Sequence, residues 1–343
     1  MDGDSMPPPR RKFGGKIELN LLIAIPCLNE EENLSSVIDS LPRHVTGFNK
    51  IDILVVDDGS TDRTPEIARN MGVNLVSHIN NRGVGEAFRS AVDFAISHRY
   101  DVLVNIDGDG QFDPEDIPRI VQPILMRQSE VVTGSRFVSG GEAVGISFPK
   151  KLGNQMLAKF ISFLVGNKHY DVSCGYRAYS REALLRMNLH GTFTYTHETF
   201  LDFAAKNYSV TEIPIRVKYF PDRDSRVAGN LLAYAVKSFK ILFRGYRDYF
   251  PLKFFWGISA VLSIIGTVLV ALFFAMYFAT GLFSGNLYLG FSGAFFLFLG
   301  ILFFVVGLLA DMLDRTRTNQ ERILYLLRAS PTNLPGASGR DRP

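Results

Sequence analysis

Before residue 220, short apolar runs alternate with longer segments in which apolar residues recur every three or four positions. The apolar runs have the length of strands and fall at 19–26, 51–57, 73–77 and 102–107. The periodic segments have the length of helices and fall at 30–41, 62–71, 84–98 and 114–127. Strands that alternate with helices predict an α/β fold, in which helices cover both faces of a mainly parallel sheet.

The pattern changes at Phe254, where an apolar stretch begins that contains no Asp, Glu, Lys, Arg or His as far as Ala310. A patch of Gly, Ser and Asn divides it into two segments, 254–279 and 287–310. Each segment exceeds the roughly 20 residues that a helix needs to cross a bilayer. Two buried core helices are the alternative, but helices so long and so free of charge are rare in soluble domains. The sequence therefore predicts a transmembrane hairpin over 254–310 and excludes a fully soluble protein.

Basic residues flank the hairpin on both sides, whereas the loop between its two segments has no charge. The flanking cations are Lys237, Lys240, Arg244, Arg247, Lys253, Arg315, Arg317, Arg322 and Arg328. By the positive-inside rule, both termini and the α/β domain are expected on the cytosolic side. The expected membrane is the plasma membrane (the inner membrane of a bacterium), or the endoplasmic reticulum membrane in a eukaryote.

Five regions follow from these patterns. We expect a disordered tail over 1–18, because that segment is rich in Pro, Gly and charge and lacks the apolar run of a signal peptide. The other expected regions are the α/β domain over 19–225, a juxtamembrane region over 226–253, the hairpin over 254–310, and a cytosolic helix and tail over 311–343.

Within the juxtamembrane region, the segment 230–249 places apolar residues on one helical face and basic residues on the other. This pattern predicts a helix that lies in the headgroup layer, with its cations toward anionic lipid. The alternative is a helix that packs on the α/β domain or on another subunit.

Composition narrows the possible partners. The chain carries 37 Lys and Arg against 34 Asp and Glu, a formal net charge of +3, whereas a dedicated nucleic-acid binder usually has a strong basic excess. Nucleic acid is therefore not an expected partner. The two cysteines, Cys27 and Cys174, cannot form a disulfide framework, and no C-x-x-C pair suggests a zinc site. Because most of the chain has the composition of a water-facing domain, a polytopic transporter is also excluded.

Four polar clusters follow the predicted strands. They are Pro-Cys-Leu-Asn-Glu at 26–30, Asp-Asp-Gly-Ser at 57–60, Asn-Arg-Gly-Val-Gly at 81–85 and Asp-Gly-Asp-Gly-Gln at 107–111. Parallel α/β sheets bind ligands beyond the carboxyl ends of their strands, so the clusters predict the position of a site. The second and third clusters are not specific by themselves, because one is also a common turn and the other can simply begin a helix.

The fourth cluster carries the clearest chemistry. Asp107, Asp109 and Gln111 occupy alternate positions on a chain that leaves a buried strand, and we expect their side chains to converge. Carboxylate and amide oxygens suit Mg²⁺ or Mn²⁺. Without a cation the two carboxylates would repel each other, so the cluster predicts a divalent metal that bridges a diphosphate.

In this order, the four clusters resemble the motifs of the family 2 glycosyltransferases, which have the GT-A fold. Gln111 and the segments Gly-Ser-Arg-Phe at 134–137 and Ser-Cys-Gly-Tyr-Arg at 173–177 are more narrowly similar to the polyprenyl-phosphate sugar transferases. That branch includes dolichol-phosphate mannose synthases and bactoprenol glucosyltransferases. The resemblance extends over about 21–309 and implies a GT-A catalytic domain, followed by interface helices and two transmembrane helices.

The resemblance also implies roles for individual residues. The nucleotide-sugar would be bound by Pro26, Leu28, Asn29, Glu30, Val56, Asp58, Asp107, Gly108 and Asp109. The metal would be held by Asp107, Asp109 and Gln111. The acceptor phosphate would be bound by Ser135, Arg136, Arg177, Arg223 and Arg226. Asp109, Arg136, Arg177 and Arg223 are the expected catalytic residues.

The chain departs from the family at one of these positions. The family often has Arg-x-x-Gly-x-Ser-Lys, whereas this chain reads Arg223-Asp224-Ser225-Arg226 and lacks the glycine. Whether Arg226 replaces the lysine is left open by the sequence. Arginine suits phosphate because its planar fork donates two parallel hydrogen bonds; for any one of these arginines, a surface ion pair is the alternative.

The reaction implied by the resemblance is an inverting transfer of a hexose from a nucleotide-sugar to a polyprenyl phosphate, either undecaprenyl or dolichyl phosphate. UDP-glucose is the favoured donor and GDP-mannose the next. A phosphate monoester has a second pKa of about 6, so the acceptor is already ionised and needs no strong general base. The hairpin and the interface helix also allow a homo-oligomer.

Other functions fit the sequence less well. A processive polysaccharide synthase has a Gln-x-x-Arg-Trp motif, but Trp256, the single Trp of the chain, follows Lys253-Phe254-Phe255. A nicotinamide dehydrogenase requires Gly-x-Gly-x-x-Gly after its first strand, where this chain has Pro-Cys-Leu-Asn-Glu. A catalytically silent membrane scaffold and a transferase with a different acceptor are the alternatives that stay open.

Overall fold

The computed structural model describes residues 18–189, 195–218, 240 and 243–330. Most of the predicted tail at 1–18 and of the juxtamembrane region at 226–253 therefore lies outside the described residues, as do 331–343. The chain forms two compact units, one made mainly of residues up to Leu231 and the other of Leu232–Asn333. Each unit is described separately below.

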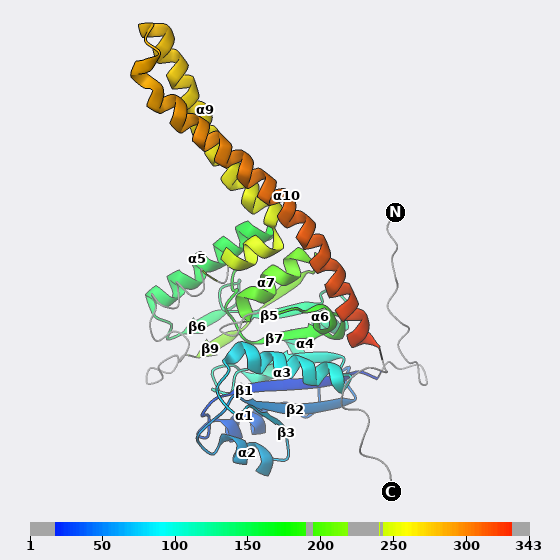
Figure 1. The fold of residues 1–343 in the computed structure, drawn as a ribbon. Helices are drawn as coiled ribbons and strands as arrows, with labels where there is room; N and C mark the ends of the chain where they lie inside the picture. Colours follow the sequence, from blue (N-terminus) through cyan, green and yellow to red (C-terminus); the bar gives the residue numbers. More distant parts are fainter. Residues whose placement is uncertain (1–17, 190–194, 219–239, 241–242, 331–343) are drawn as a thin grey trace. The chain divides into compact units, whose positions relative to one another are not determined.

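The first unit is built on a seven-stranded sheet with the order β3-β2-β1-β4-β7-β5-β8 (Figure 1). All neighbouring pairs are parallel except those of β7, which runs antiparallel to β4 and β5. The strands are β1 (Asn20–Cys27), β2 (Lys50–Asp57), β3 (Asn74–Ser77), β4 (Val102–Asn105), β5 (Val131–Ser135), β7 (Arg177–Ser180) and β8 (Val210–Pro214). The predicted α/β class with a mainly parallel sheet is confirmed.

Helices connect these strands, and the first four of them, α1 to α4, lie at the predicted places. They are α1 (Leu34–Ser40), α2 (Thr64–Asn70), α3 (Val84–Ser97), the 3-10 turn η1 (Pro114–Asp116), α4 (Ile117–Leu125), α5 (Phe148–Val165), α6 (Arg181–Arg186) and α7 (Thr196–Ala205). A second, two-stranded sheet pairs β6 (Glu142–Val144) with β9 (Arg216–Lys218). The predicted helix at 30–41 begins only at Leu34, because the residues before it form a turn.

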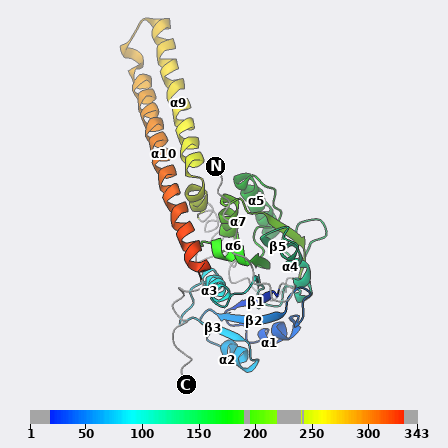
Figure 2. The ribbon, with the colours of Figure 1, turned by 90° about the vertical axis from the view of Figure 1, so that its right-hand side faces the viewer.

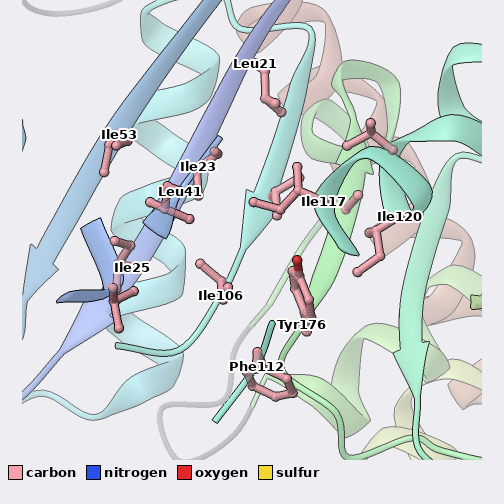
Figure 3. Packing of buried hydrophobic residues seen from close by; sticks show 14 of the residues in the cluster. Leu21, Ile23, Ile25, Leu41, Ile53, Ile106, Phe112, Ile117, Ile120 and Tyr176 are labelled. Atoms are coloured by element: carbon pink, nitrogen blue, oxygen red, sulfur yellow. The ribbon is translucent and has the colours of Figure 1, made fainter. Parts of the chain in front are cut away.

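Side chains of β1 alternate between two covered faces of the sheet, as the period of a strand requires. Leu21, Ile23 and Ile25 belong to a buried cluster that also includes residues of α1 and of α4, such as Ile117 and Ile120 (Figure 3). Leu22 and Ala24 are equally buried but point the other way, toward the face on which α3 contacts β1 and β2. The centre of the sheet is therefore buried on both faces, which explains why β1, and much of its neighbours β2 and β4, is apolar.

The order of strands reverses between β1 and β4. From β1 the sheet continues through β2 and β3 in one direction and through β4 in the other. The connections after β1 and β4 therefore separate at their carboxyl ends and leave room for a ligand between them. The clusters at 26–30 and 107–111 follow these two strands.

The second unit contains two long apolar helices, α9 (Pro251–Thr280) and α10 (Leu287–Ala329), joined by the short turn η2 (Ser284–Asn286). They run side by side along their apolar lengths (Figure 2). Gly300 permits this close approach: a Cβ at this position would lie 2.3 Å from the Ser263 Oγ, and the Gly300 carbonyl accepts a hydrogen bond from the Ser259 Oγ at 2.7 Å.

Both helices are long and apolar enough to cross a membrane, with mean hydropathies of 2.5 and 2.7 over their most apolar windows. The helix that contains the second predicted span does not end at residue 310 but continues without a break to Ala329. Of the predicted amphipathic helix at 230–249, residues 243–249 are helical, and most of the rest lies outside the described residues.

Candidate active site

The loops after β1 and β2 are joined by hydrogen bonds between backbone and side-chain groups. The Asn29 N–H donates to the Ser60 Oγ at 2.9 Å, and the Glu30 N–H donates to the Thr64 Oγ1 at 2.8 Å. In return, the Asn29 Oδ1 accepts from the Thr61 N–H at 2.8 Å. These bonds satisfy backbone groups before α1 and explain the late start of that helix. The first two polar clusters, 26–30 and 57–60, are therefore joined into one surface, which is called the wall below.

Asp58 joins the third cluster to this wall. Its buried carboxylate lies 2.7 Å from the His78 Nδ1 and accepts hydrogen bonds from the backbone N–H groups of Arg82, at 2.9 Å, and Gly83, at 2.8 Å. This pattern holds the glycine-containing turn that begins α3. These bonds engage both carboxylate oxygens of Asp58. The expected contact of Asp58 with the nucleoside stays a prediction.

The other predicted nucleoside residues differ in exposure. Pro26, Leu28 and Glu30 are partly exposed and Asn29 is exposed, so a ligand can reach them. Val56 has 0% of its surface exposed and lies in β2, which is flanked by β1 and β3 and contacted by α3. A residue with no exposed surface cannot touch a ligand in this conformation. The assignment of Val56 to the nucleoside site therefore does not fit the structure.

Asp107 and Asp109 lie in a turn that follows β4. The Gln111 N–H donates to the Asp109 Oδ1 at 3.0 Å, and Gly110 has a φ of 71°. The chain thus bends back here instead of continuing as an extended strand with alternating side chains. Burial, together with the negative charge of nearby Asp109, raises the pKa of the Asp107 carboxyl to about 7.

Gly175 packs directly on the Asp107 carboxylate. A Cβ at residue 175 would lie 3.1 Å from both carboxylate oxygens of Asp107, so a larger residue would displace the acid. This contact gives a physical reason for glycine in the Ser-Cys-Gly-Tyr-Arg segment. It also shows that the end of β4 and the start of β7 form one site.

The oxygen-bearing side chains of Asp107, Asp109 and Gln111 suit a divalent cation whose coordination is completed by the substrate. Among the described residues, no group of three or more His, Cys, Asp or Glu side chains could hold a metal ion without help. Mg²⁺ and similar ions commonly bind to one or two carboxylates and complete their coordination with substrate phosphates and water. Burial, and after it the negative charge of Asp109, raise the pKa of Asp107, and a cation bound here would stabilise the ionised carboxylate against both effects.

Arg136 forms a buried, bidentate ion pair with Asp171. The Arg136 Nε and Nη2 lie 2.6 and 2.7 Å from the two carboxylate oxygens, and the Arg136 backbone N–H also donates to this carboxylate, at 3.0 Å. Burial alone would raise the pKa of Asp171, but the charge and hydrogen bonds of Arg136 hold it below the ordinary value. The positive charge of Arg136 also partly offsets the rise in the pKa of Asp107. Asp171 therefore fixes the orientation of a cation whose charge acts on Asp107.

Replacing Asp171 with asparagine is expected to destabilise the first unit by about 3–5 kcal/mol, because it leaves the Arg136 charge buried without its partner. Unfolding of the full-length protein by denaturant measures this loss. Glu142→Gln is the matched control, since its ion pair with Arg216 is exposed and such pairs contribute about 0.2–1 kcal/mol. Equal stability losses in the two variants would contradict the assignment.

Arg177 does not fit its predicted role in phosphate binding. It is 1% exposed, and its guanidinium donates to the carbonyls of Cys174, Val172 and Thr196 at 2.8–2.9 Å, and to the Thr199 Oγ1. The guanidinium also lies 4.9 Å from the centre of the Phe200 ring. These contacts hold the segments 172–177 and 196–200 together, so the structure indicates a structural role for Arg177.

Ser135 is likewise wholly buried, and its Oγ has no hydrogen-bond partner among the described residues. In this conformation it cannot reach an acceptor phosphate. Arg223 and Arg226 lie outside the described residues, so their predicted roles, and whether Arg226 replaces a lysine, stay predictions. Of the five residues expected to bind the acceptor phosphate, the structure brings Arg136 to the carboxylates of the site.

Sequence reasoning missed Lys150, on the first turn of α5. Lys150 is half-buried, and its pKa is lowered overall. Burial is the largest cause and the positive charge of Arg136 adds to it, whereas the negative charge of Asp109 partly offsets both. The charges of Asp109 and Arg136 thus both act on Lys150, which makes it a candidate for a second cation of the site. The position of Lys150 within a regular helical pattern gave no signal for this role. Asp171 was also missed, although its place directly before the Ser-Cys-Gly-Tyr-Arg segment, in Asp171-Val-Ser-Cys, could have suggested it.

Comparison with known proteins identifies the family of the chain. The model of the glycosyl transferase family 2 matches residues 22–187. The chain is 33% identical over 220 residues to the UDP-N-acetylglucosamine–dolichyl-phosphate N-acetylglucosaminyltransferase of Methanococcus voltae, covering 58% of this chain and 86% of that protein. It is 30% identical over 239 residues to the polyprenol monophosphomannose synthase of Mycolicibacterium smegmatis, covering 66% of this chain and 87% of that protein.

Solved structures agree on the fold. Glucosyl-3-phosphoglycerate synthase from Mycobacterium tuberculosis, in complex with UDP, superimposes with a TM-score of 0.54 at 22% identity, covering 66% of this chain and 80% of that one. At this identity the likeness concerns the GT-A fold alone. The motif order, the family match and the relatives together identify the chain as a glycosyltransferase, a member of the glycosyl transferase family 2 in the branch of the polyprenyl-phosphate sugar transferases.

Proposed function

We propose that this protein transfers a hexose from a nucleotide-sugar to a polyprenyl phosphate and releases a nucleoside diphosphate. The observation that carries the proposal is a pair of carboxylates, Asp107 and Asp109, at the switch point of a GT-A sheet in a chain with two helices able to span a membrane. Relatives named for transfer to dolichyl, polyprenol and undecaprenyl phosphates support the acceptor class.

The donor is proposed to lie across the ends of β1 and β4. The wall formed by Pro26, Leu28, Asn29 and Glu30 would hold the nucleoside, and the Asp107-Gly108-Asp109 turn would meet the ribose and diphosphate. UDP-glucose is the favoured donor and GDP-mannose the next; fold neighbours that bind UDP and UDP-glucose support the first, and a relative named as a mannose synthase supports the second.

The metal is proposed to be Mg²⁺ or Mn²⁺, held by Asp107, Asp109 and Gln111. When bound, it would neutralise charge that develops on the departing diphosphate. Fold neighbours in complex with Mn²⁺ and UDP support a divalent ion. Around it, Arg136 and Lys150 supply positive charge, and the ion pair with Asp171 fixes the orientation of Arg136. A cation held in place in this way stabilises developing negative charge without reorganising during the reaction.

The nucleophile is proposed to be an oxygen of the lipid phosphate. The expected ionisation of this phosphate removes the need for a strong base, which suits a site whose described residues combine carboxylates and cations. A single displacement would invert the anomeric centre. The hairpin of α9 and α10 would anchor the protein in the membrane that contains the acceptor, with both termini and the active site in the cytosol. Self-association of the protein also stays a proposal.

Membranes that contain the full-length protein, polyprenyl phosphate and Mg²⁺ or Mn²⁺ test the proposal. Radiolabel from a panel of UDP- and GDP-sugars is followed into organic-extractable lipid. Label from one donor, abolished by EDTA and restored by the metal, is the expected result. Absence of label from every donor, with correctly inserted protein and confirmed donor binding, would instead favour a silent scaffold.

A further inference from the structure

Tyr195, which directly precedes α7, places its hydroxyl group in a buried network of hydrogen bonds at the end of β4. The hydroxyl donates to the Gly175 carbonyl at 3.2 Å and accepts from the Asn105 Nδ2 at 2.8 Å. The same Nδ2 also donates to the Gly175 carbonyl, at 3.1 Å. Because a carbonyl only accepts hydrogen bonds, Asn105 must turn its NH₂ group toward Gly175, and the hydroxyl proton of Tyr195 is directed at the same oxygen. The three groups therefore form a closed triangle of hydrogen bonds.

The ring of Tyr195 is held independently of its hydroxyl group. Tyr195 is 2% exposed, and its ring stacks on that of Phe88 in α3, with the ring centroids 3.9 Å apart and an angle of 13° between the planes. Burial, and after it the negative charge of Asp107, raises the pKa of Tyr195 well above its ordinary value. The hydroxyl therefore keeps its proton at neutral pH and stays a donor. A phenylalanine at this position would keep the stacking and lose only the hydrogen bonds.

The triangle lies against the Asp107 carboxylate. A Cβ at residue 175 would lie 3.1 Å from both carboxylate oxygens of Asp107 and 3.4 Å from the Tyr195 hydroxyl. Asn105, the last residue of β4, precedes Asp107 by two positions. The main chain of Gly175 is thus held in place by two hydrogen bonds to its carbonyl, and it limits where the Asp107 carboxylate can lie.

We infer that Tyr195 is a positioning residue for the metal site, whose hydroxyl acts through Asn105 and Gly175 to hold the Asp107 carboxylate in the orientation that a divalent cation requires. The inference rests on the proposed function in one respect, which is that Asp107 is taken as a metal-site residue. Partners that orient a metal ligand without touching the metal typically contribute about 10- to 100-fold to metal affinity. Nothing in the motif of the ligands themselves points to Tyr195, which lies far from Asp107 in the sequence.

A purely structural role is the competing explanation, because the loss of a buried hydrogen bond lowers stability anywhere in a domain. Tyr100→Phe is the matched control. Tyr100 is 5% exposed, and its hydroxyl donates to the Asp52 Oδ2 at 2.5 Å. Tyr100 lies just before β4, at the opposite end of that strand from Asp107. Both substitutions remove one buried phenol hydroxyl and should lower the melting temperature, but only Tyr195→Phe should disturb Asp107.

Binding of Mn²⁺ to the full-length protein, in the presence of UDP and in parallel of GDP, tests the inference without a measurement of activity. Free Mn²⁺ is followed by its electron paramagnetic resonance signal during titration of the parent and of each variant. We expect Tyr195→Phe to raise the Mn²⁺ concentration at half-saturation by about 10-fold or more, and Tyr100→Phe to leave it unchanged. Gly175→Ala should raise it as well, because the added Cβ would press on the Asp107 carboxylate. Saturating Mn²⁺ should restore most of the transfer rate of Tyr195→Phe, since Tyr195 is not expected to touch the substrate.

Half-saturation of Tyr195→Phe at the same Mn²⁺ concentration as the parent would overturn the inference. An equal rise in Tyr100→Phe would also overturn it, because the effect would then reflect stability and not the position of Asp107. Absence of Mn²⁺ binding by the parent with either nucleotide would overturn both the inference and the proposed metal site. The expected shift in a protein that transfers no sugar to polyprenyl phosphate would support the inference and contradict only the proposed function.

Discussion

Replacing Asp109 with asparagine is expected to lower the rate of sugar transfer by roughly 100- to 1000-fold, the range observed when one group that stabilises transition-state charge is removed. The substitution keeps the size of the side chain and its ability to accept from the Gln111 N–H, but it removes a negative charge from the pair that would hold the metal. Transfer of radiolabel to lipid measures the rate, and the metal dependence of UDP binding measures the cause.

Asp113→Asn is the matched control for this prediction. Asp113 lies four positions further along the same connection, and its side chain accepts from the Glu115 N–H at the start of η1. Asparagine serves as well as aspartate in such a capping position, so activity and stability should stay unchanged. Full activity of Asp109→Asn, or equal losses in both variants, would show that Asp109 has no special role.

Replacing Arg177 with methionine is expected to destabilise the first unit by about 3 kcal/mol or more. The substitution leaves the carbonyls of Val172 and Cys174 without the Arg177 donor, and each unsatisfied buried group costs about 1–3 kcal/mol. For a domain of this size the melting temperature should fall by roughly 6–12 °C. Thermal unfolding of the full-length protein, followed by circular dichroism, measures the change.

Arg186→Met provides the comparison, because the Arg186 ion pair with Glu182 is partly exposed and should contribute less than about 1 kcal/mol. A direct role of Arg177 in phosphate binding makes the opposite prediction: the variant would melt like the parent and lose activity through weaker binding of the acceptor. Stability and activity measured on the same preparation separate the two roles.

The sequence predicted the features that depend on local pattern. Strand and helix periods located the first four strands and the helices between them to within a few residues. The polar clusters at 26–30 and 107–111 were correctly placed at the carboxyl ends of β1 and β4, because the polarity of the chain changes sharply where each buried strand ends. The long uncharged stretch likewise predicted two helices of membrane-spanning length.

The features that depend on contacts distant in the sequence could not be predicted. Nothing local distinguishes Arg136, held at the site by Asp171, from Arg177, which is buried among backbone carbonyls. The burial of Ser135 follows from its place in β5, which lies between β7 and β8. No short sequence motif predicts that order of strands. Lys150 reaches the site only because of where the fold places the first turn of α5.

The acceptor is the part of the proposed function that one measurement tests most directly. Purified full-length protein in vesicles is supplied with labelled UDP-glucose or GDP-mannose, a divalent metal, and one of three acceptors: polyprenyl phosphate, polyprenol without the phosphate, or phosphoglyceric acid, which is bound by a fold neighbour. We expect label to appear with polyprenyl phosphate and not with the other two, and Asp109→Asn to lose it. Label transferred equally well to polyprenol, or to the water-soluble acid, would contradict the claim that a lipid phosphate is the nucleophile.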